Sequence, residues 1–281
     1  MTPRLASERD LALELARTRI ARLSALPLLD PRLLPLLAQP DADLQYQQLR
    51  ELLRVDPALA VRVLKVANSA FYGSRSISSI DRALTVLGAV AVVGIAMAAR
   101  FDASLAPGCA DVGQFRHLRR HSLMTAVAAK MLAMRAAVAP WDGEGAFLLG
   151  LLHDLGWLVQ LQMERERRLR PQNGGAPAPA GRTEHALLSA ALFAHWQLPA
   201  QFIDAVRDHH HLPETEPASS GSALLAVAEQ IAMYGGDTFG NDFRPPDSQL
   251  PLTMFHITEA DLPELGAQCA AGAALLDGLV N

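Results

Sequence analysis

The segment Ala146–Gln160 reads AFLLGLLHDLGWLVQ and places two ionisable side chains in the middle of an otherwise apolar stretch. Apolar residues lead into His153 and Asp154, and mostly apolar residues follow them. Burying an imidazole next to a carboxylate is unfavourable unless a hydrogen-bond partner, an opposite charge or a metal ion satisfies both groups. We therefore expect the fold to bring further polar groups to this pair from elsewhere in the chain.

The composition is typical of an all-α protein. The chain has 281 residues, 50% of them hydrophobic and only 5% aromatic. Alanine and leucine dominate while β-branched residues are sparse, which favours helices over strands. No segment alternates between apolar and polar residues, and no repeat is visible. We expect about a dozen helices, forming one large domain or two small ones.

Local signals place the ends of several helices. Asp56-Pro57 is a start signal, with an aspartate as N-cap and proline at the first helical position. Ser78 and Asp81 form a pair like a capping box, and Gly88 predicts a stop or a sharp bend. Residues 171–181, rich in Pro, Gly and Ala, predict a mobile linker. The expected helices cover residues 4–24, 31–38, 44–54, 57–73, 78–88, 89–101, 112–135, 146–160, 186–196, 199–211, 222–234 and 259–279.

Charge, cysteine content and hydropathy limit the partners and the cellular compartment that we expect. The net charge of -4 gives no reason to expect a nucleic-acid partner. Cys109 and Cys269 are far apart, which fits a reducing cytoplasm and offers neither a disulfide framework nor a zinc knuckle. The N-terminus lacks the apolar core of a signal peptide. Residues 83–99 carry no charge but are short for a membrane span and contain two glycines, so we expect a buried helix and no membrane contact.

A set of histidines and carboxylates is expected to converge on the His153-Asp154 pair. Imidazole and carboxylate ligands together suit Fe, Mn, Zn or Ni, and the set could hold one ion or two. A bound divalent ion could activate water to attack a phosphoester. The alternative for each histidine is a structural role, hydrogen-bonded to a backbone carbonyl; His117 is expected at the surface, and His195 and His256 outside the set. The candidate residues are His121, His153, Asp154, His185, His209, His210 and Glu229.

The order of these segments resembles a known family. Leu26-Pro27, then VDPALAVRVLKVANSAFYG (55–73) and SISSIDRALTVLG (76–88), are similar to the N-terminal half of an HDOD domain. HSLMTAVAAKMLA, FLLGLLHDLGWL, EHALLSAALFAHWQLP and AVRDHHH, within 121–211, resemble its C-terminal, HD-like half. The resemblance implies a multi-helix HDOD fold. Its expected parts are an N-terminal helical extension (1–20), an N-terminal helical half (21–110), an HD-like half (111–236) and a C-terminal loop and helix (237–281).

The HDOD family is related to HD phosphohydrolases and to HD-GYP cyclic-di-GMP phosphodiesterases. By position, His121 matches the first ligand histidine of those enzymes, and His153-Asp154 matches the HD pair. His185 matches the histidine of the next helix, and His209-His210 match the paired histidines. Glu229 falls where the related enzymes place a closing aspartate.

Three departures from the enzymes favour a non-catalytic protein. Trp157 occupies the position of the phosphate-stabilising lysine of HD-GYP enzymes, and HHHLPETEP (209–217) replaces a GYP-type loop. Glu229 adds a methylene to a ligand whose reach matters. Metal binding can survive such changes where hydrolysis does not.

The resemblance implies a bacterial regulatory protein that acts as an output or scaffold module through protein partners. Its contact surface would be an apolar groove between the two halves or the N-terminal helix. The alternative is a metal-dependent phosphohydrolase of a nucleotide or cyclic dinucleotide, with clustered arginines attracting phosphate. A third hypothesis is a sensor that binds metal or a nucleotide without turnover. The arginines concerned are Arg116, Arg119, Arg120, Arg165, Arg167, Arg168 and Arg170.

Overall fold

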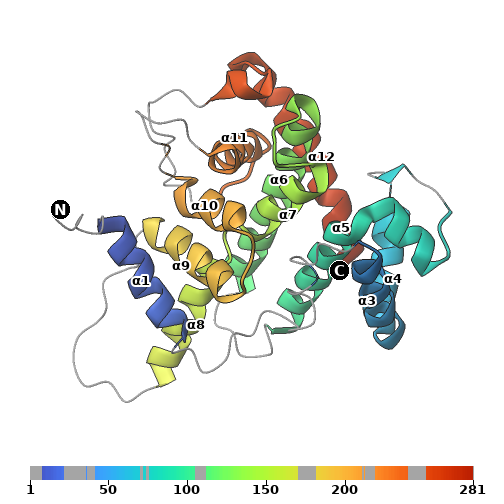
Figure 1. Cartoon of the computed structure of the whole chain (residues 1–281). Coiled ribbons are helices and arrows are strands. Elements are labelled where there is room, and N and C mark those ends of the chain that lie inside the picture. The colour runs from blue at the N-terminus through green and yellow to red at the C-terminus, as the bar shows by residue number, and fades with distance from the viewer. Residues whose placement is uncertain are drawn as a thin grey trace.

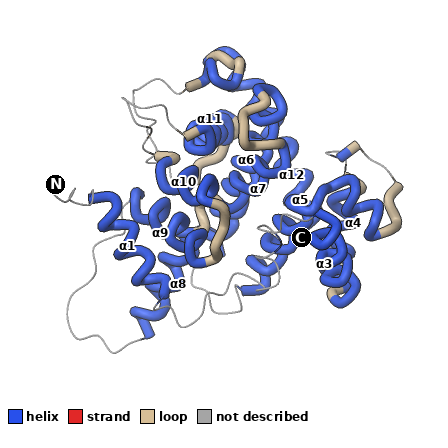
Figure 2. The backbone as a smooth tube through the Cα atoms, viewed as in Figure 1, coloured by secondary structure: helices blue, strands red, loops and turns tan. Residues whose placement is uncertain are grey.

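The computed structural model confirms the all-α class. It describes residues 8–21, 36, 42–69, 72–73, 76–104, 112–169, 182–210, 212, 219–239 and 251–280. Within these ranges the secondary structure is helical, with no strand (Figure 2). The expected linker over 171–181, most of the helix expected over 31–38, and Cys109 lie outside the described residues. The expected domain boundaries remain predictions.

Before residue 112, the described residues include four helices. They are α1 (Glu8–Ala21), α3 (Ala42–Val55), α4 (Pro57–Ala67) and α5 (Ile80–Ser104). The start of α4 is as predicted, because the Asp56 side chain accepts the Leu59 N–H with Pro57 in the first turn. After α4, the Asn68 side chain hydrogen-bonds both the N–H and the C=O of Ile77, and so closes the loop between α4 and α5.

One predicted signal around α5 needs a correction, and the other is confirmed. The predicted cap at Ser78 is wrong by one residue, since Ser79 accepts the Arg82 N–H and the helix begins at Ile80. Gly88 makes the sharp bend that was one of its two predicted alternatives. Its φ of 77° is open to glycine without strain, and helical residues continue on the far side to Ser104. None of the described helices is long and apolar enough to cross a membrane.

The remaining described helices follow from residue 112 onward (Figure 1). The predicted helix over 146–160 is two helices, because the chain turns at residues 153–155 and a new helix starts at Gly156. The C-terminal helix crosses back, so α12 contacts α4 as well as α6 and α11. The elements are α6 (Val112–Ala136), α7 (Gly143–Leu152), α8 (Gly156–Leu169), α9 (Arg182–His195), α10 (Ala200–Asp208), α11 (Ser220–Tyr234), η2 (Leu252–Phe255), η3 (Glu259–Asp261) and α12 (Leu262–Val280).

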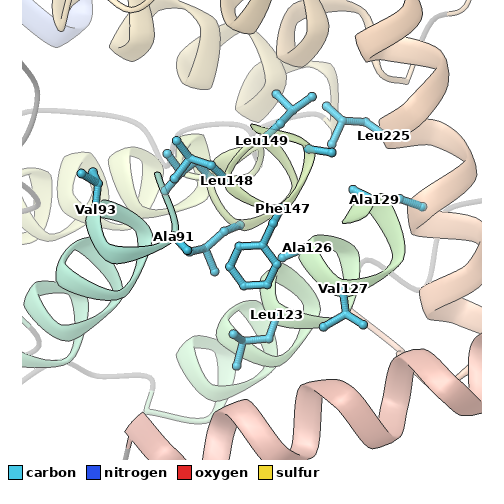
Figure 3. Close-up of a cluster of buried hydrophobic side chains, with 14 of the residues drawn as sticks. Ala91, Val93, Leu123, Ala126, Val127, Ala129, Phe147, Leu148, Leu149 and Leu225 are labelled. Carbon is cyan, nitrogen blue, oxygen red and sulfur yellow. The ribbon is translucent and has the colours of Figure 1, made fainter. Parts of the chain in front are cut away.

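The core joins the two parts of the chain where α5, α6, α7 and α11 meet. Figure 3 shows Phe147 of α7 among side chains of α5 and α6, with Leu225 of α11 nearby. Alanine and leucine fill this region because small residues let the helices approach closely. The labelled cluster is Ala91, Val93, Leu123, Ala126, Val127, Ala129, Phe147, Leu148, Leu149 and Leu225.

Two glycines set the spacing of the helices that carry the polar residues. A Cβ atom on Gly150 would lie 2.7 Å from the backbone of α6, at Thr125 O and Ala126 Cα. A Cβ atom on Gly156 would lie 1.9 Å from the carbonyl oxygen of His185. Glycine at these positions therefore allows α7 to lie against α6, and the start of α8 to lie against α9.

Candidate metal centre

The seven predicted side chains reach one buried region from five places in the fold. His121 comes from the middle of α6, and His185 lies near the start of α9. The turn between α7 and α8 supplies His153 and Asp154. The end of α10 supplies His209 and His210, and α11 supplies Glu229. All are buried except His210, which is partly buried.

Their ligand atoms fall into two groups, each compact enough to surround one ion. One group is Asp154, His185, His209 and His210, and the other is His121, His153 and Glu229. Within each group the ligand atoms all lie within 4.8 Å of one another. In the first group, Nε2 of His185 is 2.9 Å from Nε2 of His210. In the second, Nε2 of His121 is 3.1 Å from Nε2 of His153.

Each group contains one carboxylate, and each carboxylate also lies close to a histidine of the other group. Asp154 Oδ2 is 3.3 Å from Nε2 of His121, and Asp154 Oδ1 is 3.1 Å from Nε2 of His185. Glu229 Oε1 is 3.2 Å from Nε2 of His153 and 3.3 Å from Nε2 of His209. Each carboxylate thus connects imidazoles of one group to imidazoles of the other.

Backbone carbonyls fix the orientation of two of the imidazoles. The Nδ1–H groups of His153 and His209 donate to the carbonyl oxygens of Gly150 and Val206, each at 2.7 Å. Each histidine follows the last residue of its helix, where the carbonyls have no partner within the helix. The Nε2 atoms are therefore left to face the centre of the site, as metal-ligating histidines do.

The pKa values follow from burial and these contacts. Burial raises the pKa of Asp154, but His153 and His185 outweigh burial and hold it well below its usual value. Burial likewise raises the pKa of Glu229, but His210 and His209 lower it to about 2. For His209, burial and the neighbouring His210 both lower the pKa, which favours the neutral imidazole. The site thus combines ionised carboxylates with a neutral histidine.

These residues fit a divalent cation. Among the described residues, Asp154 Oδ1, His209 Nε2 and Glu229 Oε1 are buried with no hydrogen-bond partner. Buried polar atoms without partners are costly, and here all three atoms point into a set of further ligand atoms. Imidazole nitrogens and carboxylate oxygens are donors that suit Fe, Mn, Zn and Ni.

The structure adds residues that the sequence did not single out as part of the site. Asp237 follows α11 and lies 2.5 Å from Nδ1 of His121. Phe239 lies against the His121 ring and also contacts the edge of Trp157. Trp157 itself stacks on His185. Asp237 and Phe239 lie beyond a Gly-Gly turn in a polar stretch with no helical period, so no pattern pointed to them.

Other predicted residues lie apart from the site. His117, His195 and His256 are exposed. Arg119 of the basic cluster on α6 pairs with Asp277 of α12, Nη2 to Oδ1 at 2.5 Å, which gives it a structural contact. Arg165, Arg167, Arg168 and Arg170 lie outside the side chains that the structure describes.

An all-α fold that buries this histidine and carboxylate set is the setting for the comparison with known families. The HDOD domain family matches residues 23–212, and the chain belongs to that family. A protein of Treponema pallidum, described as uncharacterized, is 28% identical over 276 residues. The match covers 89% of this chain, and the chain spans about half the length of that relative, 50%.

Solved structures share the fold. An HDOD domain protein of unknown function from Geobacter sulfurreducens superposes with a TM-score of 0.63 at 23% identity, covering 96% of this chain and 94% of that one. A candidate signal transduction protein of Marinobacter aquaeolei gives 0.67 at 19% identity, covering 97% and 65%. A candidate phosphohydrolase of Shewanella amazonensis gives 0.64 at 21% identity, covering 96% and 98%.

Proposed function

We propose that this protein is a non-catalytic HDOD module of bacterial signal transduction. It acts in the cytoplasm through protein partners, and it holds a divalent ion, or two, in the site built around His153 and Asp154. Iron, manganese, zinc and nickel all suit the donors. The bound ion ties α6, α9, α10 and α11 to the turn between α7 and α8.

The observation that carries the non-catalytic assignment is the aromatic cover over the ligands. Trp157 lies flat on His185, in the position where HD-GYP enzymes carry a phosphate-stabilising lysine, and its edge contacts Phe239. An indole ring offers no cation to a transferred phosphate, whereas phosphoryl chemistry depends on such charges. The ligands beneath it, His210 excepted, are at most 6% exposed. This arrangement favours holding an ion over presenting it to a substrate.

The exposed face of α1 supports the N-terminal helix as a surface for a protein partner. Leu13 and Ile20 of α1 are buried, and α1 packs on α9, which carries His185. Leu11 and Leu15, one turn apart, are 61% and 55% exposed. Two large apolar side chains left uncovered on one helix are suited to a protein contact. The groove between the two halves stays a prediction.

Elemental analysis of the metal-free and reconstituted protein, purified without a metal-binding tag, tests the proposal. We expect about one or two equivalents of a divalent metal and their loss in a His153→Ala variant whose helix content is unchanged. Exposed His195 offers a matched control, since His195→Ala should bind metal as the wild type does. A wild-type protein that takes up no metal contradicts the metal site.

Phosphodiesterase assays test the non-catalytic part. Metal-loaded protein should hydrolyse a generic phosphodiester and a cyclic dinucleotide no faster than the His153→Ala variant. Faster turnover would contradict the proposal and favour the second candidate function, a metal-dependent phosphohydrolase.

One observation favours that second candidate. The two oxygens of Asp154 face different ligand groups, which is how a carboxylate bridges two ions about 3.5–4 Å apart in two-metal hydrolases. Ions bound there would supply an activated water for attack on a phosphoester. Asp154 would hold His121 of one group next to His185 of the other, and Glu229 would do the same for His153 and His209.

A further inference from the structure

Asp237 is the buried acid next to the site that neither candidate ligand group includes. It follows the turn Gly235-Gly236 at the end of α11, and its backbone N–H donates to the carbonyl oxygen of Ala232 at 3.1 Å. Gly236 adopts a φ of 82°, and a Cβ atom on Gly235 would lie 2.6 Å from Gly266 O of α12. Both glycines therefore serve the turn that directs residue 237 back toward α6.

The Asp237 carboxylate uses both of its oxygens. Oδ2 lies 2.5 Å from Nδ1 of His121, and Oδ1 accepts the backbone N–H of Phe239 at 3.2 Å. The side chain of Asp237 is 4% exposed. A carboxylate held on both sides in this way has little freedom to leave the imidazole.

His121 needs such a partner for a reason that lies in its position. His153 and His209 follow the ends of their helices, where carbonyls three residues earlier accept their Nδ1–H groups. His121 lies in the middle of α6, where the carbonyls are already used by the helix. Its Nδ1 can be fixed only by a group from another element, and Asp237 is that group among the described residues.

We propose that Asp237 is a positioning residue for the metal centre. By accepting the Nδ1–H of His121, it fixes the imidazole with Nε2 directed at Asp154 and His153, 3.3 and 3.1 Å away. With an ion on Nε2, Asp237 and His121 would form the carboxylate–histidine–metal relay that orients ligand histidines and strengthens their donor nitrogen. The inference rests on the metal binding of the proposed function. It adds a residue that touches no ion yet sets the affinity for one.

The test is a titration of the metal-free protein with Zn²⁺ by calorimetry. An Asp237→Asn variant keeps the size of the side chain but removes its charge, and we expect its Zn²⁺ affinity to fall by about 10–100-fold. An Asp237→Glu variant restores the carboxylate and should recover part of that loss. Asp204→Asn is the matched control, because Asp204 pairs with Arg207 on the surface of α10 and should leave the affinity unchanged.

A second measurement does not depend on how the variants fold. In zinc-loaded wild-type protein labelled with ¹⁵N in its histidines, NMR should show His121 bound through Nε2 and protonated at Nδ1. Coordination through Nδ1 would overturn the inference, as would an Asp237→Asn variant that is folded and binds Zn²⁺ as tightly as wild type. In both of these outcomes the proposed metal site survives. A wild-type protein that binds no Zn²⁺ would instead overturn the metal site and the role of Asp237 together.

Discussion

The indole ring of Trp157 lies parallel to the imidazole of His185, with ring centroids 4.8 Å apart and an interplanar angle of 17°. Stacking of this kind buries a ligand imidazole on one face while its Nε2 remains directed at Asp154, 3.1 Å from Oδ1. The same residue therefore covers the site and holds one of its ligands in place. Because Trp157 is fluorescent, we expect its emission to respond to an ion bound at His185.

Trp157 should report metal binding. A paramagnetic ion such as Ni²⁺ bound beside His185 should quench the emission of the stacked indole, whereas Trp141 and Trp196 make ring contacts with Phe202 and Phe193, away from the ligands. In a Trp157→Phe variant the quenching should be largely lost while calorimetry still shows binding. Undiminished quenching in that variant would contradict the assignment of His185 to the ion.

Gly156→Ala should destabilise the protein strongly. The added Cβ would meet the backbone of α9, 1.9 Å from His185 O, which cannot move without displacing a predicted ligand. We expect a loss of about 3 kcal/mol in the free energy of unfolding, measured by denaturant titration, together with weaker metal binding. Gly143→Ala is the matched control, since Gly143 begins α7 as Gly156 begins α8, and its Cβ would meet only the flexible side chains of Met134 and Lys130. Equal losses in the two variants would contradict the argument from close packing.

Metal affinity should rise with pH. Burial disfavours protonated His121, but its hydrogen bonds to Asp154 and Asp237 outweigh burial and raise its pKa to about 10. Below that pH the metal-free protein keeps a proton on this histidine, and the ion has to displace it, so acid competes with metal. For each proton released, the affinity should change about tenfold per pH unit. Calorimetry in buffers of different ionisation enthalpy counts the protons, and an affinity independent of pH between about 6 and 9 would contradict this prediction.

Asn68→Ala should destabilise the N-terminal helices. The amide donates to Leu64 O at 2.8 Å and to Ile77 O at 2.7 Å, and its oxygen accepts the Ile77 N–H at 2.6 Å. Leu64 O keeps the backbone N–H of residue 68, but the N–H and C=O of buried Ile77 lose their partners, which should cost about 2–3 kcal/mol, measured by thermal or denaturant unfolding. Asn68→Asp keeps the acceptor but places a carboxylate oxygen beside the carbonyl oxygens of Leu64 and Ile77, so its loss should be at least as large. A loss for Asn68→Asp far below that for Asn68→Ala would show that the donated bonds contribute little.

Much of the fold could be predicted because its signals are local. Asp56-Pro57 fixes the start of α4, and the helical period of α6 and α11 is unbroken over many residues. The prediction was wrong where a turn interrupts a stretch whose composition favours a single helix. The apolar stretch 146–160 has a helical composition throughout, yet the turn at 153–155 interrupts it and lets Gly156 approach α9.

The site was harder to predict than the fold, for a physical reason. His153 and Asp154 stood out because their neighbours are apolar, and Glu229 because it lies in an apolar helical pattern. Asp237 lies among polar residues after a turn, where a carboxylate is ordinarily solvated. Only the path of the chain through Gly235-Gly236 brings it to His121. Nothing in the spacing of residues along the chain encodes that path.

The bend at Gly88 divides α5 into two helical segments that meet at an angle. The segment before Gly88 is linked to α3 through the Tyr46 hydroxyl, which donates to Leu84 O. The segment after Gly88 lies so close to α7 that a Cβ atom on Gly94 would be 3.3 Å from Leu151, two residues before His153. We expect a tilt of α3 to be passed through α5 to the turn that carries His153 and Asp154. A partner seated on the N-terminal helices would have this mechanical route to the ligands, without touching any of them.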